Sequence, residues 1–237
     1  QKNNYLDEVE FLYKKSINLN PSYYPSYNNL AHFLRDKQNQ KDGIEYINKA
    51  FKYNPDVALL HYTLCLLLSD LDYLKDAEKS AQRAIQLEPE FGLAHSHLAE
   101  IFRKLNRLDE ARDSIDKALK LLPNHGKSYS ILGAIVLNQG LIKESKDYFL
   151  CSLSLNKYLA TSYYNLSRFK EFSFTPEYRQ ALFSDEFMSK SSIDDQIDLL
   201  FSRANVCHKE KKYVESSNYY LKANNKKLKI RPSNCYE

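Results

Sequence analysis

Four prolines recur at a fixed interval, and this interval restricts the fold more than any other feature of the sequence. Each is separated from the next by 34 residues, and the four are Pro21, Pro55, Pro89 and Pro123. One more interval leads to Lys157, in the segment SLNKY, which parallels the segments around the prolines. A period of this length is typical of an array of helical hairpins, in which each repeat contacts only its neighbours. We therefore expect a helical repeat protein rather than a chain wrapped around one central core.

The units of the array follow from this period if each begins three residues after its proline. A half unit at 1–23 then precedes four complete units, and a degenerate unit starts at residue 160. The complete units are 24–57, 58–91, 92–125 and 126–159. We assign residues 1–171 to the array.

Within each unit, certain slots always hold the same kind of residue. The fourth slot holds a tyrosine or a histidine, in the order Tyr27, His61, His95, Tyr129 and Tyr163. Small residues fill the eighth slot (Ala31, Cys65, Ala99, Gly133, Ser167), the twentieth (Gly43, Ala77, Ala111, Ser145) and the twenty-seventh (Ala50, Ala84, Ala118, Ser152). These slots form one stripe on each of two helices. Each unit is therefore predicted to be a pair of amphipathic helices whose small residues let the two backbones approach closely.

The ends of the predicted helices carry their own signals. The fifteenth slot, between the two helices, holds Asp72, Asn106 and Gly140, which tolerate the left-handed backbone that closes a helix, and Gln38 departs from this pattern. Just beyond the prolines, the side chains of Ser22, Asp56 and Asn124 are predicted to cap the next helix by accepting from its free amides.

This combination of slots resembles the tetratricopeptide repeat family. The family's mark is an aromatic residue at slot four, Leu-Gly or Leu-Ala at slots seven and eight, alanine at slots twenty and twenty-seven, and proline near slot thirty-two. The resemblance covers residues 5 to about 170 and implies an all-α fold, an α-solenoid of helical hairpins wound into a right-handed superhelix. It also implies a protein or peptide partner held in the concave groove.

The repeat pattern breaks down after the segment SYYNLSRFK. Residues 172–192 are predicted to connect the array irregularly, with one helix at about 176–189 that begins at Pro176. A cap at Ser192 is then expected to open a variant hairpin at 193–230, and residues 231–237 form a tail.

This C-terminal region resembles the tetratricopeptide region of bacterial proteins that join such repeats to a sulfotransferase domain. The residues that carry the resemblance are Tyr164-Asn165-Leu166, Ile197, Leu199, Phe201, Tyr213, Ala223-Asn224 and Lys226 to Lys229. The resemblance implies that a sulfotransferase follows Glu237, and the first residue, Gln1, with Met188 as the only methionine, indicates a part of a longer protein. Two alternatives stay open: a stand-alone adaptor, and an array in front of a glycosyltransferase.

The sequence itself offers no catalytic, cofactor or metal site. Phosphate-binding loops need closely spaced glycines at a helix start, but the five glycines here are scattered through the repeats. The four cysteines lie too far apart for zinc spacing, and His95 and His97 point in different directions on a helix. We therefore expect a non-enzymatic chain.

Composition excludes two further classes of partner. The net charge of +4, from 34 basic and 30 acidic residues, is too small to indicate nucleic-acid binding. The sequence contains no apolar run long enough to cross a membrane, and the dispersed cysteines suggest reduced thiols in a cytoplasmic protein. The sequence does not favour any oligomeric state.

Binding residues are expected on the first helix of each unit, away from the stripe that packs. The candidates are Asn28, His32, Arg35, Tyr62, Ser69, Ser96, Glu100, Arg103, Ser130, Tyr164 and Arg168. The three arginines are suited to pairing with carboxylates of a partner, and the two tyrosines to providing rigid contact area. The alternative for each of these positions is that it is simply a solvated polar residue.

Overall fold

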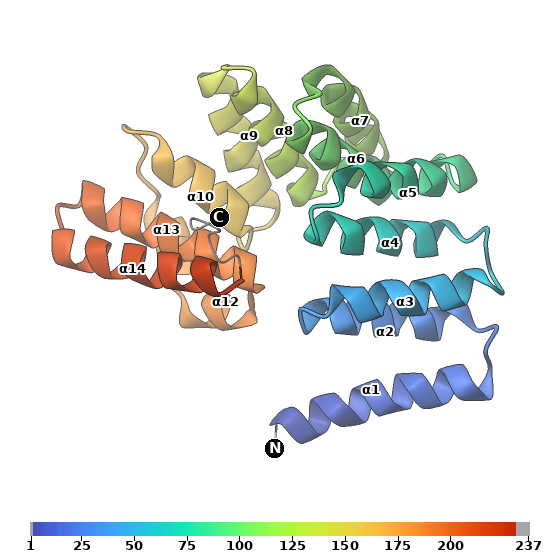
Figure 1. Cartoon of the computed structure of the whole chain (residues 1–237). Helices are drawn as coiled ribbons and strands as arrows, with labels where there is room; N and C mark the ends of the chain where they lie inside the picture. Colours follow the sequence, from blue (N-terminus) through green and yellow to red (C-terminus); the bar gives the residue numbers. More distant parts are fainter. Residues whose placement is uncertain (1, 231–237) are drawn as a thin grey trace, which may run out of the picture. The chain divides into compact units, whose positions relative to one another are not determined.

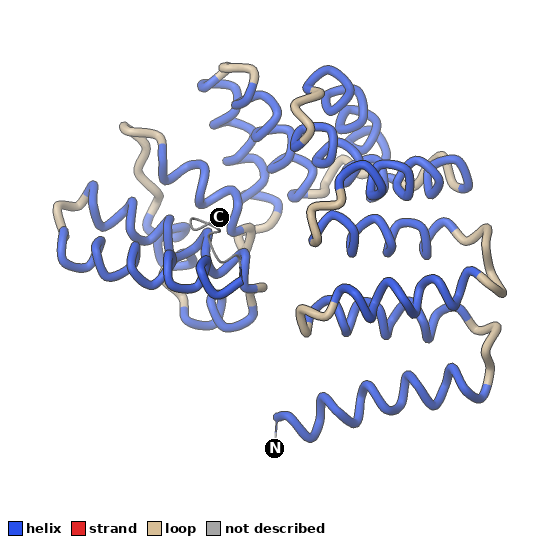
Figure 2. Tube along the Cα trace, viewed as in Figure 1, coloured by secondary structure: helices blue, strands red, loops and turns tan. Residues whose placement is uncertain are grey.

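The computed structural model describes residues 2–230, and all regular structure in that range is α-helical (Figures 1 and 2). The all-α helical-repeat fold predicted from the sequence is confirmed. The chain divides into two compact units, unit 1 at Gln1–Pro123 and unit 2 at Asn124–Glu237. The predicted tail at 231–237 lies outside the described residues.

Unit 1 is a succession of antiparallel hairpins. Helix α1 (Lys2–Leu19) packs on the first hairpin, α2 (Tyr24–Asp36) with α3 (Gln40–Phe51). The second and third hairpins are α4 (Ala58–Asp70) with α5 (Leu74–Leu87) and α6 (Gly92–Lys104) with α7 (Leu108–Leu121). Each first helix begins at the first slot of a 34-residue unit, so the sequence period and the helix positions coincide.

Unit 2 starts with the same architecture and then departs from it. The hairpin of α8 (Gly126–Asn138) and α9 (Ile142–Leu155) is followed by a short first helix, α10 (Ala160–Arg168). Two small helices then occur, α11 (Pro176–Leu182) and α12 (Asp185–Lys190). The last hairpin joins α13 (Ile193–Lys209) to α14 (Tyr213–Ile230), and α13 packs directly against α10.

In four of the five units, the slot-four side chain ties the unit to the end of the preceding one. The Tyr27 hydroxyl donates to the Pro21 carbonyl at 3.1 Å, and Tyr163 donates in the same way to the Lys157 carbonyl at 3.0 Å. In His61 and His95 the Nε2 atom lies 2.8 and 2.9 Å from the carbonyls of Pro55 and Pro89. Since a carbonyl only accepts, these imidazoles must carry the proton on Nε2. This hydrogen bond explains why histidine replaces tyrosine at this slot.

The small-residue slots are needed for close packing of the hairpins. Ala31, Ala77 and Ala84 are completely buried. A Cβ atom added to Gly133 would lie 2.9 Å from the Phe149 ring, and one added to Gly43 would lie 3.1 Å from Leu67. Small residues at these positions therefore allow the two helices of a hairpin to pack closely and form the core of the unit.

A left-handed residue closes the first helix of each of the five hairpins. Asp72, Asn106 and Gly140 have φ values of 62°, 58° and 82°, as predicted. Gln38, at 62°, adopts the same conformation although its side chain does not favour it, and Lys211 does so at 61° in the last hairpin. The turn is therefore imposed by the hairpin even where the residue type resists it.

The predicted helix caps are missing from the 34-residue units and present at the last hairpin. The residues preceding α2, α4 and α8 are Tyr23, Val57 and His125, and none makes a side-chain capping bond. The prediction for Ser22, Asp56 and Asn124 was wrong because these residues lie one position too early to reach the free amides. Ser192, by contrast, caps α13 by accepting from the Asp195 amide at 3.1 Å, as predicted.

The connecting segment contains two helices rather than the single one predicted at about 176–189. The break occurs at Phe183–Ser184, where the Ser184 side chain starts α12 by accepting from the Phe187 amide at 3.3 Å. Buried Arg203 holds this break in place, since its guanidinium donates to the carbonyls of Leu182 and Ser184, both at 2.9 Å. The guanidinium satisfies the Leu182 carbonyl, which lies at the end of α11 where carbonyls have no helical partner, and places a positive charge at the negative end of the helix dipole.

We predict that Lys211→Gly stabilises the protein, because glycine adopts positive φ without the steric cost of a Cβ atom. The gain should be about 1 kcal/mol, which chemical denaturation can measure. Gly140→Ala at the equivalent turn is the matched opposite and should destabilise by a similar amount. If both variants were as stable as the natural chain, the backbone conformation of these turns would not limit stability.

We predict that Ala84→Arg destabilises the protein by several kcal/mol, because Ala84 is completely buried on α5 and the substitution places a charge in the packed interior. Thermal unfolding followed by circular dichroism measures the effect. Gln82→Arg introduces the same side chain two residues earlier, at an exposed position, and serves as the control. An unchanged melting temperature for Ala84→Arg would contradict the packing described above.

Candidate protein-binding site

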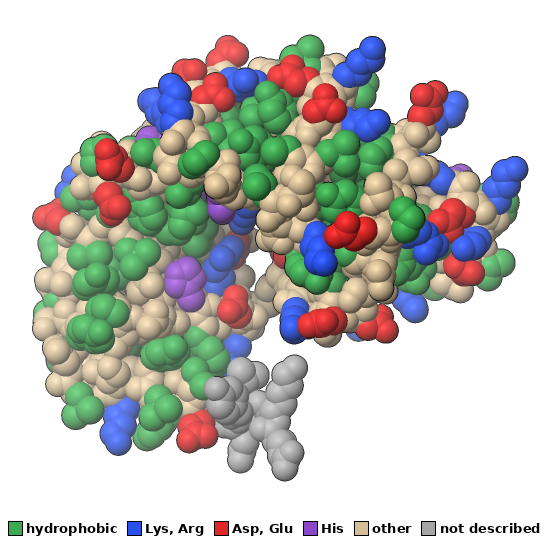
Figure 3. All heavy atoms as spheres, turned by 180° about the vertical axis from the view of Figure 1, so that it is seen from behind, with side chains coloured by type: hydrophobic (Ala, Val, Ile, Leu, Met, Phe, Trp, Pro, Cys, Tyr) green, Lys and Arg blue, Asp and Glu red, His purple; other side chains and the backbone are tan. Residues whose placement is uncertain are grey.

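The first helices of unit 1 present a row of polar and aromatic side chains, which we call the first-helix face. It consists of His32, Arg35, Tyr62, Glu100 and Arg103, on α2, α4 and α6. All five are half-buried. In Figure 3, histidine side chains lie next to Lys and Arg side chains and among hydrophobic ones on the left, where unit 1 is seen.

Arg35 is already paired within the protein. Its guanidinium donates from two nitrogens to both carboxylate oxygens of Asp70 on the next first helix, at 2.5 and 3.0 Å. The two side chains are 30% and 27% exposed, so water screens the pair only in part. Burial alone would lower the pKa of Arg35, but the hydrogen bond that it donates to Asp70 raises the pKa, so the charge is fixed.

Arg103 is neutralised in the same way. It donates to both oxygens of Glu100, one turn earlier on α6, at 2.8 and 2.7 Å. The sequence indicated that Arg35 and Arg103 are suited to pairing with carboxylates of a partner. The structure instead satisfies both with the chain's own acidic residues, because Asp70 and Glu100 lie within reach on the folded surface.

Tyr62 and His32 give this face its ring surfaces. The Tyr62 ring lies 5.0 Å from that of Phe91 and 6.3 Å from that of His97, measured between centroids. Burial raises the pKa of Tyr62 to about 12, so its hydroxyl is a neutral hydrogen-bonding group. Burial also lowers the pKa of His32, whose Nε2 lies 3.3 Å from the Thr63 hydroxyl. The ring residues are therefore uncharged near neutral pH.

Four other predicted residues turn away from solvent. Asn28, Ser69, Ser96 and Ser130 are at most 7% exposed. Asn28 accepts a hydrogen bond from Thr63 at 2.6 Å, and Ser130 accepts one from Ser162 at 2.9 Å, each across two neighbouring first helices. Because these first helices pack closely, Asn28 and Ser130 each form a hydrogen bond from one helix to the next.

The last two predicted residues, Tyr164 and Arg168, lie on α10 in unit 2. Tyr164 is half-buried, Arg168 is exposed, and the guanidinium stacks 5.3 Å above the tyrosine ring. Sequence reasoning missed that Phe201 on α13 and Tyr220 on α14 extend this ring surface. Both positions follow the apolar pattern of their helices, so the sequence suggested packing only.

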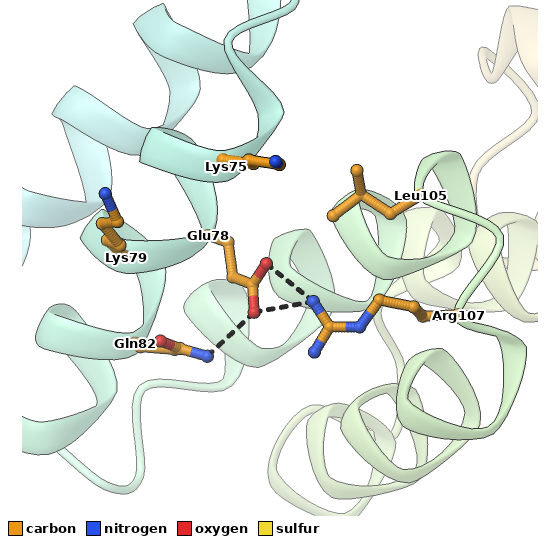
Figure 4. Close-up of a pocket in the computed structure, with 6 residues that line it drawn as sticks. All are labelled: Lys75, Glu78, Lys79, Gln82, Leu105 and Arg107. Carbon is orange, nitrogen blue, oxygen red and sulfur yellow. Dashed lines mark hydrogen bonds and ion pairs between the residues drawn. The ribbon is translucent and has the colours of Figure 1, made fainter.

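Unit 1 also contains a pocket of about 390 Å³, lined by Lys75, Glu78, Lys79, Gln82, Leu105 and Arg107 (Figure 4). Arg107 crosses it to donate twice to Glu78, at 2.9 and 2.8 Å, and its other side contacts Glu110. The guanidinium also stacks 4.3 Å from the Phe102 ring centroid. The charges that line the pocket therefore serve to join α5 to the α6–α7 turn.

Cys65 and Cys207 are buried thiols, and Cys151 is partly buried. Burial raises the pKa of Cys65 to about 12, which removes the reactive thiolate at neutral pH.

Among residues 2–230, no group of three or more His, Cys, Asp or Glu side chains is arranged to hold a metal ion. Within the same range, every helix is too short or too polar to cross a membrane.

Comparison with known proteins identifies the repeat. Two tetratricopeptide-repeat family profiles match, one at residues 12–45 and one at 92–125. Among curated proteins, none matches the sequence.

Solved structures of similar shape support the same fold. Pseudomonas aeruginosa pilF is 17% identical, with 96% of this chain and 94% of that chain covered and a TM-score of 0.60. A tetratricopeptide repeat protein from Parabacteroides merdae is 14% identical, with coverages of 94% and 88% and a TM-score of 0.66. YrrB, described as a TPR protein with an unusual peptide-binding site, is 19% identical, with coverages of 84% and 97% and a TM-score of 0.53. The chain therefore contains tetratricopeptide repeats.

Proposed function

We propose that this chain is a non-catalytic scaffold that binds a segment of another protein along the first-helix face of unit 1. The observation that carries the proposal is the row of half-buried rings and preformed ion pairs on α2, α4 and α6. Arg35 with Asp70 and Arg103 with Glu100 are both held by two hydrogen bonds. Ordered side chains lose little entropy when a ligand arrives, which favours binding.

The chemistry of this face favours apolar and hydrogen-bonding contacts over attraction of an acidic segment. Both arginines are neutralised by the chain's own carboxylates, so the face carries no surplus positive charge from them. Tyr62 supplies a ring surface, and Leu59 and Leu93, near the start of α4 and α6, are 36% and 37% exposed. Aromatic side chains in such settings often provide most of the binding energy.

The similarity to YrrB gives separate support. That protein is described as having a peptide-binding site, and its chain is covered to 97% by the similarity. A repeat array has an extended surface on which each unit contributes a few side chains, and this suits an extended ligand better than a compact one.

A finer proposal is that the scaffold binds a substrate or partner for a sulfotransferase domain that belongs to the same polypeptide. It rests on the residue pattern of α10, α13 and α14, among them Tyr164, Phe201 and Tyr213. We expect the natural gene to continue beyond the codon for Glu237 into a strand, a phosphate-binding turn and a helix. Sequencing of the gene checks this, and a stop codon at that point would favour the stand-alone adaptor.

Site-specific cross-linking tests the binding face. We predict that a photoreactive phenylalanine analogue at Tyr62 forms a covalent adduct with a partner protein in cells. The same analogue at Gln82, which is exposed on α5 and away from the first-helix face, serves as the matched control.

The adduct at Tyr62 should disappear when His32 and Arg103 are both changed to alanine, because these side chains lie on the same face. Circular dichroism verifies that the double variant is folded. Adducts of equal yield at Tyr62 and Gln82, or none at either position, would contradict the proposal.

A further inference from the structure

Three aromatic rings from three helices form a continuous surface in unit 2. The rings of Tyr164 on α10 and Phe201 on α13 are 6.2 Å apart between centroids, and those of Phe201 and Tyr220 on α14 are 6.1 Å apart. All three side chains are half-buried. We call this surface the three-ring face. It exists because α10 packs directly against α13.

A chain of hydrogen bonds joins the three helices that carry the rings. The Tyr220 hydroxyl donates to Asn205 at 2.6 Å, and Asn205 donates to the Ser167 hydroxyl at 2.9 Å. Ser167 in turn donates to the Tyr164 carbonyl at 2.8 Å. The network links α14, α13 and α10, so it fixes the Tyr220 ring and the spacing of the three helices before any ligand binds. A preformed surface reduces the entropy lost on binding.

One end of the three-ring face carries an available positive charge. The Arg168 guanidinium stacks on the Tyr164 ring at 5.3 Å and is exposed. Arg168 forms no ion pair with any residue in the range 2–230, unlike Arg35 and Arg103 in unit 1. Its hydrogen-bond donors are therefore available to a carboxylate from outside the chain.

The other end carries a half-buried carboxylate that lacks a cation. Asp198 lies one turn before Phe201 on α13 and accepts a hydrogen bond from Thr161 on α10. Burial, and then the nearby Asp195 and Asp194, raise the pKa of Asp198 to about 7. Lys226 on α14 donates to Gln196, and no described basic side chain pairs with Asp198. Burying an unpaired carboxylate is unfavourable, and a cation from a ligand would relieve this cost.

The spacing of the two charges defines the length of the ligand. Thr161, which contacts Asp198, and Arg168 are seven residues apart on α10, which corresponds to about 10 Å along the helix. An extended peptide rises about 3.3 Å per residue, so about three residues span this distance.

We propose that the three-ring face binds an extended segment of a partner protein in which a basic and an acidic residue, about three positions apart, flank an aromatic or large aliphatic residue. The basic residue pairs with Asp198, the acidic residue pairs with Arg168, and the apolar side chain lies on the rings of Tyr164 and Phe201. This inference rests on the proposed protein-binding function and extends it to a second surface with its own specificity.

The experiment is selection of random dodecapeptides displayed on phage against the whole chain. Peptides selected through this face should share a Lys or Arg and an Asp or Glu about three positions apart. Selection on Arg168→Gln should lose the acidic position and keep the basic one, and selection on Asp198→Asn should show the reverse. Synthetic peptides of the selected pattern should bind each variant roughly tenfold more weakly, as measured by fluorescence anisotropy.

The variants have matched controls in the same unit. Lys170→Gln and Glu177→Gln remove one exposed charge of each sign outside the three-ring face and should leave the selected pattern unchanged.

Asp198→Asn should fold at least as well as the natural chain. Because the pKa of Asp198 is about 7 in the folded state and near 4 when unfolded, the natural chain loses stability as the pH rises from about 4 to 7. Asp198→Asn lacks this loss and should melt a few degrees higher at pH 8.

The outcomes separate the two proposals. Peptides whose binding depends on Tyr62 but is unaffected by Arg168→Gln and Asp198→Asn would overturn the three-ring site and leave the proposed function intact. Failure to select any peptide would overturn both. A pattern with the charges three positions apart, lost one charge at a time in the two variants, is the result that we expect.

Discussion

Hydrogen bonds from slot four to the carbonyl at the end of the preceding unit set the spacing of most neighbouring units. Such a bond joins the first turn of a first helix to the residue where the previous second helix has just ended, as in Tyr27 to Pro21 and His95 to Pro89. The donor is a large ring that also packs in the interior, so one residue sets both the position and the depth of the next hairpin. A change in unit length would break this bond, which favours a constant period of 34 residues.

In unit 2 the same bond persists while the hairpin that it normally supports is lost. Tyr163 still reaches the Lys157 carbonyl, but α10 is followed by α11 and α12 in place of one second helix. Rings from the connecting segment, among them Phe174 and Phe187, pack on Tyr163 in compensation. Arg203 then fixes the α11–α12 break through two backbone carbonyls. As a result α13 packs directly on α10, and this arrangement brings together Tyr164, Phe201 and Tyr220.

The two proposed binding surfaces differ in how their charges are balanced. In unit 1 each arginine of the first-helix face is paired with an acidic residue of the chain, so the face is ordered and nearly neutral. In unit 2 Arg168 and Asp198 lie at opposite ends of the three-ring face, and neither pairs with an oppositely charged side chain among the residues that the structure describes. Unpaired charges on a rigid apolar surface discriminate between ligands, because a mismatched ligand leaves them desolvated and unpaired.

The sequence by itself determined the features that depend on neighbouring residues in the chain. The proline period, the paired helices, the small-residue slots and the left-handed turns at Asp72, Asn106 and Gly140 all reflect local backbone preferences and helical periodicity. Only the tertiary structure decided which side chains meet across hairpins. Arg35 finds Asp70 thirty-five residues away, and Arg203 binds carbonyls twenty-one and nineteen residues earlier. Burial of Ser96 and Ser130 depends equally on how closely neighbouring helices pack. Such pairings are set by the distances between packed helices, and the local sequence pattern contains no measure of those distances.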